Sequence, residues 1–317
     1  MKAIGLTEFG GPEVLKVVEL PEPQPGPGEL RIRVQAAPVN PTDITFRTGG
    51  RAAQLSKRPT PYVPGMDVAG IVDKLGAGTD GRLAVGDAVI AFVIPMGPHR
   101  GAYAEQVVVP EASVVPAPLG ATFAEASTLL LNATTARLAL DALAQPAGTT
   151  VAVLGAAGAV GGYAIQLAKE DGLIVLADAD PADETLVRGL GADIIIGRGE
   201  EIGAAVRREL PSGAPGLIDT AALNALALPA VADGGGLVTV KGWTGPSERG
   251  IVIHPVSSFD SATDTRLFDR LRSQVEEGIL TLRVADVLPA KEAADAHRRL
   301  AAGGIRGRLV LDFSQPL

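Results

Sequence analysis

The stretch 151–169, VAVLGAAGAVGGYAIQLAK, constrains the fold of this 317-residue chain more than any other. Its first four residues are apolar throughout, as is expected for a strand buried on both faces of a parallel sheet. Three glycines follow, then helix-forming residues, and 173–177 reads as the next strand. A strand, a glycine-spaced turn and a helix in this order predict a phosphate-binding βαβ unit.

Each glycine of the turn has its own expected task. Gly155 permits the tight exit from the strand, Gly158 lets the backbone approach a pyrophosphate, and Gly161 lets the helix pack on the sheet. The backbone amides of Ala159 and Val160, at the start of the helix, then face the phosphate oxygens, with the positive end of the helix dipole behind them. The alternative is a turn with no ligand.

Length and composition narrow the function classes. A chain of 317 residues suits two domains. The 36 acidic and 28 basic residues give a net charge of −8, without the basic block that nucleic acid or an anionic membrane selects. The absence of cysteine removes disulfides and thiolate metal sites. The start of the chain lacks a signal-peptide pattern and the apolar run 126–131 is too short for a bilayer, so we expect a cytoplasmic protein.

The chain divides into a β-rich part and a βαβ part. Residues 1–119 are short alternating runs broken by glycine and proline, best seen where Leu30, Ile32 and Val34 alternate with Arg31 and Arg33. The strands expected in this part are 30–36, 68–72, 88–93 and 103–109.

From Thr122 the pattern predicts one long helix, ended by Pro146 and Gly148. Strands and helices then alternate to about residue 254, with later strands of the parallel sheet at 194–196, 216–220 and 237–240. The elements expected after that are a helix over 264–277, a strand over 284–288, an amphipathic helix over 291–300 and a final strand over 308–311.

In this order of segments the chain resembles the medium-chain dehydrogenase/reductase superfamily over nearly its whole length, and within it the zinc-free, zeta-crystallin-like quinone oxidoreductase branch. The motifs that carry the resemblance are AAPVNPTDITFRTGG (36–50), PYVPGMDVAGIV (61–72), GAYAEQVVVP (101–110), GAAGAVGGYAIQLAK (155–169), LGADIII (190–196) and KEAADAHRRLAAGGIRGRLVL (291–311). The implied fold is α/β: a GroES-like β-barrel catalytic domain over 1–119, completed by 260–317, and a Rossmann NAD(P)-binding domain with a doubly wound parallel sheet over 120–259.

Zinc ligands are missing from the positions where zinc-dependent relatives carry them. Asn40 stands where they have cysteine, and Gly65-Met66-Asp67 stands where they have Gly-His-Glu. We therefore expect no zinc and no other metal. Hydride transfer to an acceptor that is already polarised does not need a Lewis acid.

The three histidines are not spaced along the chain as metal ligands usually are. We expect His297 to be solvated on a polar helix and His254 to lie at a strand end before Pro255. His99 lies in a loop and is kept as a candidate for the acceptor pocket.

The resemblance places Asn40 and Asp43 beside the nicotinamide pocket and Thr135 against the nicotinamide ribose or ring. Alternatively, Asn40 and Asp43 only cap a turn and Thr135 bonds to its own helix. Many relatives have a tyrosine two residues after the aspartate, where this chain has Thr45. Proton donation would then pass to Tyr62, to another polar group such as Tyr103 or His99, or to water.

Further residues are assigned to the site, the first two of them by the resemblance. They are Lys241 and Gly242 at the carboxamide side of the cofactor, Arg306 and Arg308 near it, and Tyr62, His99, Trp243 and Phe259 as walls of the acceptor pocket. The alternative for the cations is an ordinary surface position, and for the aromatic residues an ordinary core position.

The choice between NADH and NADPH stays open. The resemblance implies NADPH, and Arg198 is a suitable partner for its 2′-phosphate. The loop ADADPADE implies NADH, because Asp178 stands where an acidic side chain accepts hydrogen bonds from the ribose hydroxyls and repels a 2′-phosphate. Asp180 and Asp183 add to this repulsion.

These features predict an NAD(P)H-dependent reductase of a quinone or enone that works without zinc. One alternative is an enoyl reductase or dehydrogenase of a biosynthetic pathway, and another is a nucleotide-binding protein with little catalysis. We also expect a homodimer that pairs the strand region 237–253 edge to edge.

Overall fold

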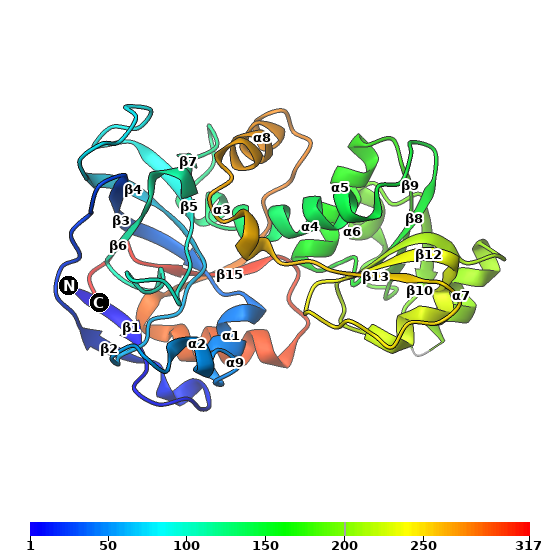
Figure 1. The fold of residues 1–317 in the computed structure, drawn as a ribbon, viewed down its shortest axis with the longest axis horizontal. Coiled ribbons are helices and arrows are strands. Elements are labelled where there is room, and N and C mark those ends of the chain that lie inside the picture. Colours follow the sequence, from blue (N-terminus) through cyan, green and yellow to red (C-terminus); the bar gives the residue numbers. More distant parts are fainter. Residues whose placement is uncertain (200) are drawn as a thin grey trace. The chain divides into compact units, whose positions relative to one another are not determined.

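The structure, a computed structural model, describes residues 1–199 and 201–317. The chain folds into two compact units, which Figure 1 shows as ribbons. The first unit comprises Met1–Leu131, Ser261–Glu276 and Leu282–Leu317, and the second comprises Asn132–Asp260 and Glu277–Thr281. Within the described part of the chain, no helix has the length and apolarity needed to cross a membrane.

The first unit is built on a seven-stranded sheet in the order β14-β15-β3-β4-β5-β7, with β6 also paired to β3. Its strands are β3 (Glu29–Pro38), β4 (Asp67–Leu75), β5 (Ala88–Phe92), β6 (Gln106–Pro110), β7 (Val114–Pro116), β14 (Val284–Pro289) and β15 (Arg308–Asp312), beside the pair β1 (Lys2–Gly5) and β2 (Lys16–Glu19). Its α-helices are α1 (Pro41–Arg47), α2 (Ala52–Leu55), α3 (Phe123–Ala126), α8 (Thr265–Glu276) and α9 (Ala293–Ala302). Short 3₁₀ turns are η1 (Pro12–Val14), η2 (Glu111–Ser113) and η5 (Ala290–Glu292).

The end of the chain completes the first unit, as expected for this fold. Strand β15 pairs antiparallel with β3, with Val310 opposite Pro38. The predicted alternation along β3 is confirmed, since Leu30 and Ile32 are fully buried whereas Arg33 is exposed. This places an apolar face inside the unit.

The second unit holds a six-stranded sheet in the order β10-β9-β8-β11-β12-β13, and every pairing in it is parallel. Its strands are β8 (Thr150–Leu154), β9 (Ile174–Ala179), β10 (Ile194–Gly197), β11 (Ala214–Asp219), β12 (Val231–Thr239) and β13 (Val252–Pro255). Its helices are α4 (Leu130–Leu143), α5 (Ala159–Glu170), α6 (Glu184–Gly189), α7 (Ile202–Glu209) and the 3₁₀ segment η3 (Asn224–Ala230), and η4 (Ser258–Ser261) lies at its end.

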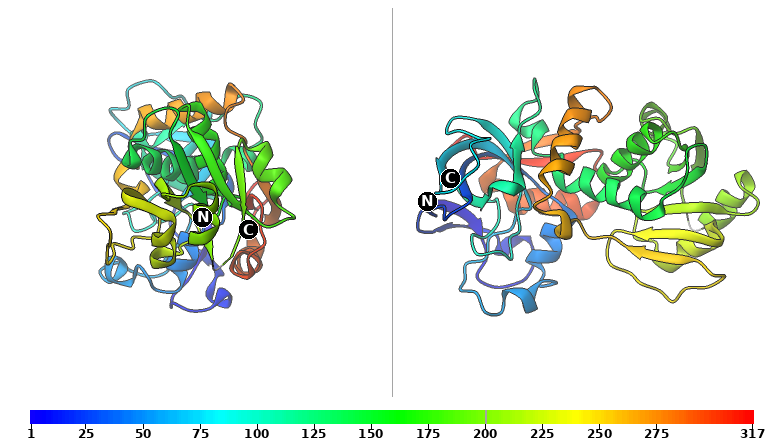
Figure 2. Two further views of the ribbon diagram at one scale, coloured as in Figure 1. Left: turned by 90° about the vertical axis from the view of Figure 1, so that its right-hand side faces the viewer. Right: turned by 45° about the horizontal axis from the view of Figure 1, so that its top comes forward.

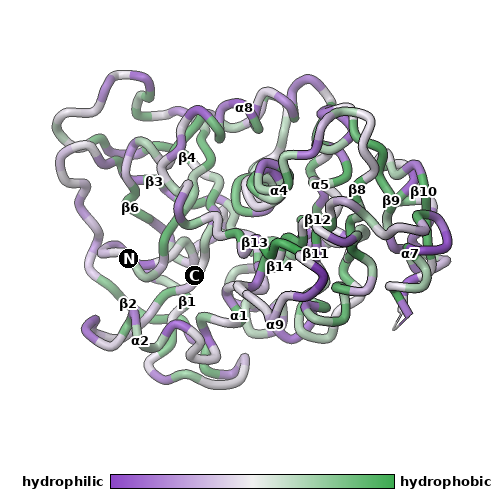
Figure 3. The backbone as a smooth tube through the Cα atoms, turned by 45° about the vertical axis from the view of Figure 1, so that its right-hand side comes forward, coloured by the Kyte–Doolittle hydropathy of each residue, from purple (hydrophilic) through white to green (hydrophobic). Residues whose placement is uncertain are grey.

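Helices lie on both sides of this parallel sheet (Figure 2), so its central strands are apolar on both faces. The residues of β8 after Thr150 are all buried, and Figure 3 shows this strand as hydrophobic. On one face Ile202 and Val206 of α7 pack with Leu154 and Leu217 in a continuous core. The predicted doubly wound sheet is therefore present.

The long helix predicted from Thr122 is wrong in one respect, because the structure breaks it into α3 and α4. The Ser127 hydroxyl donates to the Ala124 carbonyl at 2.8 Å, and the Thr128 hydroxyl donates to the Glu125 carbonyl at 2.8 Å. Such side-chain bonds to nearby carbonyls compete with helical ones. Periodicity alone does not reveal this competition.

The strand predicted over 103–109 begins only at Gln106. The preceding residues are held in a buried turn, where the amides of Ala102 and Tyr103 donate to the carbonyls of Gly65 and Pro64, both at 3.0 Å. Tyr103 is fully buried at this turn. The large ring of Tyr103 fits the alternating pattern expected of a strand, although Tyr103 does not belong to strand β6.

Candidate cofactor site and buried polar cluster

The glycine turn between β8 and α5 has the geometry that its sequence predicts. Gly155 has φ +76°, and a Cβ there would lie 2.5 Å from Thr220 Oγ1. A Cβ on Gly161 would lie 2.4 Å from the Gly155 carbonyl oxygen. Both positions therefore exclude a side chain, one for the backbone conformation and one for close packing of the helix.

Helix α5 presents a terminus suited to an anion. Its N-cap is Gly158, which has no side chain to cover the first-turn amides, and Ala159 and Val160 follow without an acidic residue in the first turn. Amides and the helix dipole favour negative charge at this place. The residues present thus fit a nucleotide pyrophosphate.

Asp178, at the end of β9, is tied to this turn. Its Oδ1 accepts the amides of Gly155 at 2.7 Å and Ala156 at 3.0 Å. The side chain is 3% exposed, and desolvation by burial raises its pKa. Sequence reasoning assigned Asp178 to the ribose alone and missed that it also fixes the turn.

Arg198 lies between two carboxylates. Its Nε is 3.8 Å from Asp178 Oδ2, and its Nη1 is 3.6 Å from Asp180 Oδ2. Arg198 and Asp180 are 45% and 51% exposed, so their pair is open to solvent, whereas Asp178 meets the same guanidinium from a buried position. Asp183, at the N-cap of α6, is buried and donates its amide to the Asp180 carbonyl at 2.8 Å.

In the first unit, Asn40 and Asp43 form the start of α1. The Asn40 amide donates to Asp43 Oδ2 at 2.8 Å, and Asp43 Oδ1 accepts the Gly65 amide at 2.9 Å. Both residues are fully buried. Desolvation by burial raises the pKa of Asp43 to about 6, against the lowering effect of these amides. The capping role weighed in the sequence is present.

Asp67 joins this cluster from the start of β4. Its Oδ2 accepts the side-chain amide of Asn40 at 2.9 Å, and its Oδ1 accepts the Leu131 amide at the start of α4 at 2.8 Å. Asp67 is 1% exposed, and desolvation by burial raises its pKa to about 7. Sequence reasoning noted Asp67 only for the absence of a zinc motif.

The expectation of a solvated His297 is wrong, because His297 is fully buried on α9. Its Nδ1 accepts from Arg47 Nε at 3.3 Å, and its Nε2 lies 3.4 Å from the Tyr103 hydroxyl. Desolvation by burial lowers its pKa to about 3. A signal was available, since Ala293, Ala296 and His297 fall on one apolar stripe of the helix.

Three other predicted residues of the first unit contact groups outside this cluster. Thr45 is exposed and donates to the Pro41 carbonyl at 3.3 Å. Tyr62 stacks on Phe9 with ring centroids 5.6 Å apart. His99 pairs with Glu29 at 3.0 Å, at the far end of β3 from Asn40, which does not support a place in the acceptor pocket.

The remaining predicted residues keep their assignments as predictions. Thr135 lies on α4, Lys241 and Gly242 are exposed after β12, Trp243 packs against the core of the second unit, Phe259 is half-buried in η4, Arg306 is half-buried, and Arg308 is buried on β15.

The donor set does not fit a zinc ion. The chain has no cysteine, and the amide of Asn40 is engaged with Asp67. Across residues 1–199 and 201–317, no group of three or more His, Cys, Asp or Glu side chains is placed to hold a metal.

Two family models match the chain. The alcohol dehydrogenase GroES-like domain matches residues 26–119, and the zinc-binding dehydrogenase model matches residues 190–311. The quinone oxidoreductase of Mus musculus is 31% identical, over 98% of this chain and 97% of its own. The NADPH-dependent alkenal/one oxidoreductase of Arabidopsis thaliana is 32% identical, over 98% of this chain and 79% of its own.

Solved structures of oxidoreductases are also similar to this chain over nearly its whole length. A protein described as an NAD-dependent alcohol dehydrogenase is 33% identical with a TM-score of 0.84, over 98% of this chain and 99% of its own. A mycobacterial protein complexed with NADPH is 29% identical with a TM-score of 0.87, over 98% of this chain and 100% of its own.

Proposed function

Because this chain belongs to the medium-chain dehydrogenase/reductase superfamily, in its quinone oxidoreductase branch, we propose that it is an NAD(P)H-dependent oxidoreductase that reduces a quinone or an α,β-unsaturated carbonyl. The observation that carries the proposal is the turn at Gly155, where the closely packed glycines and the open N-terminus of α5 fit a nucleotide. Relatives named as quinone and alkenal/one oxidoreductases supply the acceptor class.

When bound, the nicotinamide supplies a hydride, and the protein supplies binding and orientation. The amides of Ala159 and Val160 would hold the pyrophosphate, and Asp178 keeps their turn in place by accepting the amides of Gly155 and Ala156. Quinones and enones draw the incoming charge to their oxygens, so a positioned hydrogen-bond donor is the main requirement for the acceptor.

We propose Asn40 as that donor. Its backbone is fixed by Asp43, and its side-chain amide is held by Asp67, so its position is set on two sides. Thr45 is exposed and bonded to its own helix, which leaves it a poor substitute for a tyrosine. Reduction then proceeds without zinc, because the side chains at the family's ligand positions do not form a zinc site.

For the cofactor we propose that NADH binds at least as well as NADPH. The support is the placement of Arg198 between Asp178 and Asp180, since a 2′-phosphate would compete with both carboxylates for the same guanidinium. The case for NADPH is that one relative is named as NADPH-dependent and that one similar solved structure is complexed with NADPH.

We further propose a homodimer formed at β13, the edge strand of the six-stranded sheet. Val252 on this strand is 52% exposed, and an uncovered parallel edge is open to pairing with another copy. The sequence pointed to the whole region 237–253, and within it β12 is covered by β13.

The activity is tested by incubating the protein with NADH or NADPH and a panel of quinones, enones and enoyl thioesters. Oxidation of the nucleotide that depends on an acceptor supports the proposal, and preference for the thioesters favours the enoyl reductase alternative. Tight nucleotide binding without turnover of any acceptor rejects a reductase and leaves a binding protein. Gly155→Val, whose side chain would meet Thr220, is expected to abolish nucleotide binding.

A further inference from the structure

A buried carboxylate lies at the carboxyl end of β11. Asp219 is the last residue of that strand, it is fully buried, and its neighbours in the sheet are Leu154 of β8 and Thr239 of β12. Its Oδ1 accepts the Ala221 amide at 3.1 Å, and its Oδ2 accepts the Asn224 amide at 2.7 Å. Both carboxylate oxygens are thus committed to the loop that follows the strand, whose amides replace the water that a buried charge has lost.

The loop 220–224 has a backbone conformation that most side chains avoid. Ala222 has φ +60° and Asn224 has φ +55°, and both values lie in the left-handed region. Asparagine tolerates this region, whereas alanine adopts it at a cost. Such conformations persist only where the surrounding structure holds them, and they gather at functional sites. The two amides that Asp219 accepts lie on either side of Ala222 along the chain, so the carboxylate fixes the backbone around it.

The same loop is attached to the glycine turn. The Thr220 hydroxyl donates to the Leu154 carbonyl at 2.6 Å and lies 3.2 Å from the Gly155 carbonyl oxygen. The packing is close, since a Cβ on Gly155 would lie 3.0 Å from the Ala221 amide nitrogen. A displacement of the loop would therefore change the surroundings of the turn to which the pyrophosphate is assigned.

The loop occupies the part of the sheet where α/β proteins bind ligands. The strand order β10-β9-β8-β11-β12-β13 changes direction between β8 and β11, because the chain adds β9 and β10 on one side of β8 and β11 to β13 on the other. Ligands of such sheets lie outside the carboxyl ends of the strands at this switch point. The glycine turn follows β8 and the loop 220–224 follows β11, so the two segments flank that point.

Two backbone groups of the loop are left for a ligand. Ala221 and Ala222 are half-buried, and across the residues that the structure describes their carbonyl oxygens accept no hydrogen bond. A carbonyl that a ligand covers needs a donor in place of water. A dinucleotide carries such donors, the hydroxyl groups of its two riboses.

We propose that Asp219 is a positioning residue for the nucleotide. Its carboxylate holds the loop 220–224 in the left-handed conformation against the glycine turn, and in that conformation the carbonyls of Ala221 and Ala222 accept ribose hydroxyls. Without the carboxylate the loop relaxes to ordinary backbone conformations, and a nucleotide binds only the fraction of molecules that keeps the strained one. The inference rests on the proposed function for the presence of a nucleotide at this edge of the sheet, and not on the identity of the acceptor.

The first test compares nucleotide affinity in matched variants by isothermal titration calorimetry, well below the unfolding temperature. Asparagine has one side-chain oxygen and can accept only one of the two amides. Asp219→Asn should therefore weaken NADH and NADPH alike by about tenfold to a hundredfold, the range for one hydrogen bond to a charged group. Adding Ala222→Gly should restore most of the lost affinity, because glycine adopts a positive φ without strain.

The control for this test is Asp233→Asn, which changes an exposed acid near the start of β12 and should bind both nucleotides as the parent does. Affinity in Asp219→Asn equal to that of the parent overturns the proposal. A loss of affinity that Ala222→Gly does not restore also overturns it, because Asp219 then acts on the stability of the unit and not on the conformation of the loop.

The second test keeps the carboxylate and so does not depend on the folding of an Asp219 variant. Ala222→Val should weaken both nucleotides, because a β-branched side chain disfavours a positive φ, whereas Ala222→Gly should bind them as the parent does. Equal affinities in these two variants overturn the proposal. If the parent binds nucleotides but reduces no acceptor, the proposed reductase is refuted and the affinities above still decide the role of Asp219; a parent that binds neither nucleotide refutes both.

Discussion

Replacement of Asp180 by serine tests how this protein distinguishes NADH from NADPH. Asp180 and Asp178 both pair with Arg198, but only Asp178 also holds the glycine turn. Asp180→Ser therefore removes a charge beside the guanidinium without disturbing the turn. We expect NADPH to bind more tightly and NADH to bind nearly as before.

The magnitude follows from the geometry of the pair. Arg198 Nη1 and Asp180 Oδ2 are 3.6 Å apart, and both side chains are about half exposed. Coulomb's law in water gives about 1 kcal/mol at this distance, and exposed pairs contribute roughly 0.2–1 kcal/mol. Releasing Arg198 and removing the repulsion of a 2′-phosphate together amount to about 1–2 kcal/mol, or about 5- to 30-fold in the ratio of dissociation constants.

The assay is isothermal titration calorimetry, which gives the dissociation constant of each nucleotide for the parent and three variants. Arg198→Ala should weaken NADPH and leave NADH nearly unchanged, because NADH has no group there for the guanidinium to pair with. Asp178→Ser should weaken both nucleotides, since the turn amides lose their acceptor. If neither Asp180→Ser nor Arg198→Ala alters the ratio, this loop does not contact the adenosine ribose and the assignment is wrong.

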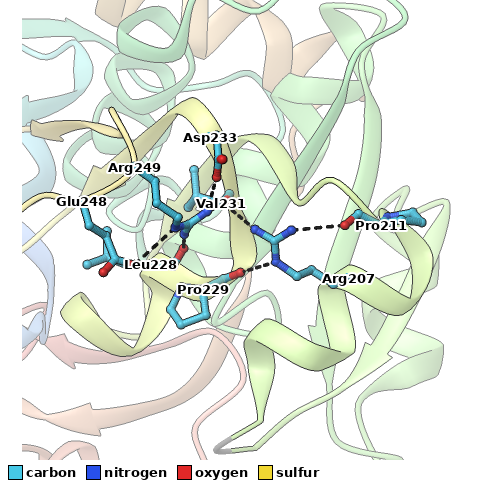
Figure 4. Close-up of polar contacts among 8 residues, drawn as sticks. All are labelled: Arg207, Pro211, Leu228, Pro229, Val231, Asp233, Glu248 and Arg249. Carbon is cyan, nitrogen blue, oxygen red and sulfur yellow. Dashed lines mark hydrogen bonds and ion pairs between the residues drawn. The ribbon is translucent and has the colours of Figure 1, made fainter.

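Three further outcomes are expected. Arg207 donates to the carbonyls of Pro229, Pro211 and Val231 (Figure 4). Arg207→Ala should therefore lower the free energy of unfolding, measured by denaturant titration, by about 1–3 kcal/mol. The control Arg208→Ala, at an exposed position, should change it by less than about 0.5 kcal/mol. Burial lowers the pKa of His297 from 6.5 to about 3, so between these pH values the unfolded chain binds a proton that the folded chain does not. His297→Gln should therefore lose less unfolding free energy than the parent as pH falls from about 6.5 toward 3. Equal dependence of the unfolding free energy on pH in the two proteins contradicts a buried neutral histidine. Val252→Lys at the edge strand should convert the proposed dimer to a monomer in light scattering, and a parent that is already monomeric rejects the dimer.

The sequence by itself determined the parallel sheet and the nucleotide turn. The apolar run ending at Leu154, with Gly155 and Gly161 at fixed spacing, predicts a local structure whose requirements lie within some fifteen residues. The φ of +76° at Gly155 and the close packing at Gly161 are steric needs that only glycine meets. The alternation along β3 could also be predicted from the sequence, because the side chains of a strand with one buried face alternate between apolar and polar.

Only the tertiary structure decided the buried polar cluster. Asn40, Asp67, Tyr103 and His297 are far apart in the chain, and each of them has a plausible local role that hides the shared one. Whether a histidine on a polar helix is solvated depends on what packs against that face, and here the first unit buries it against Tyr103. Burial and the direction of hydrogen bonds set pKa values and amide orientation, and both arise from residues that meet only when the chain is folded.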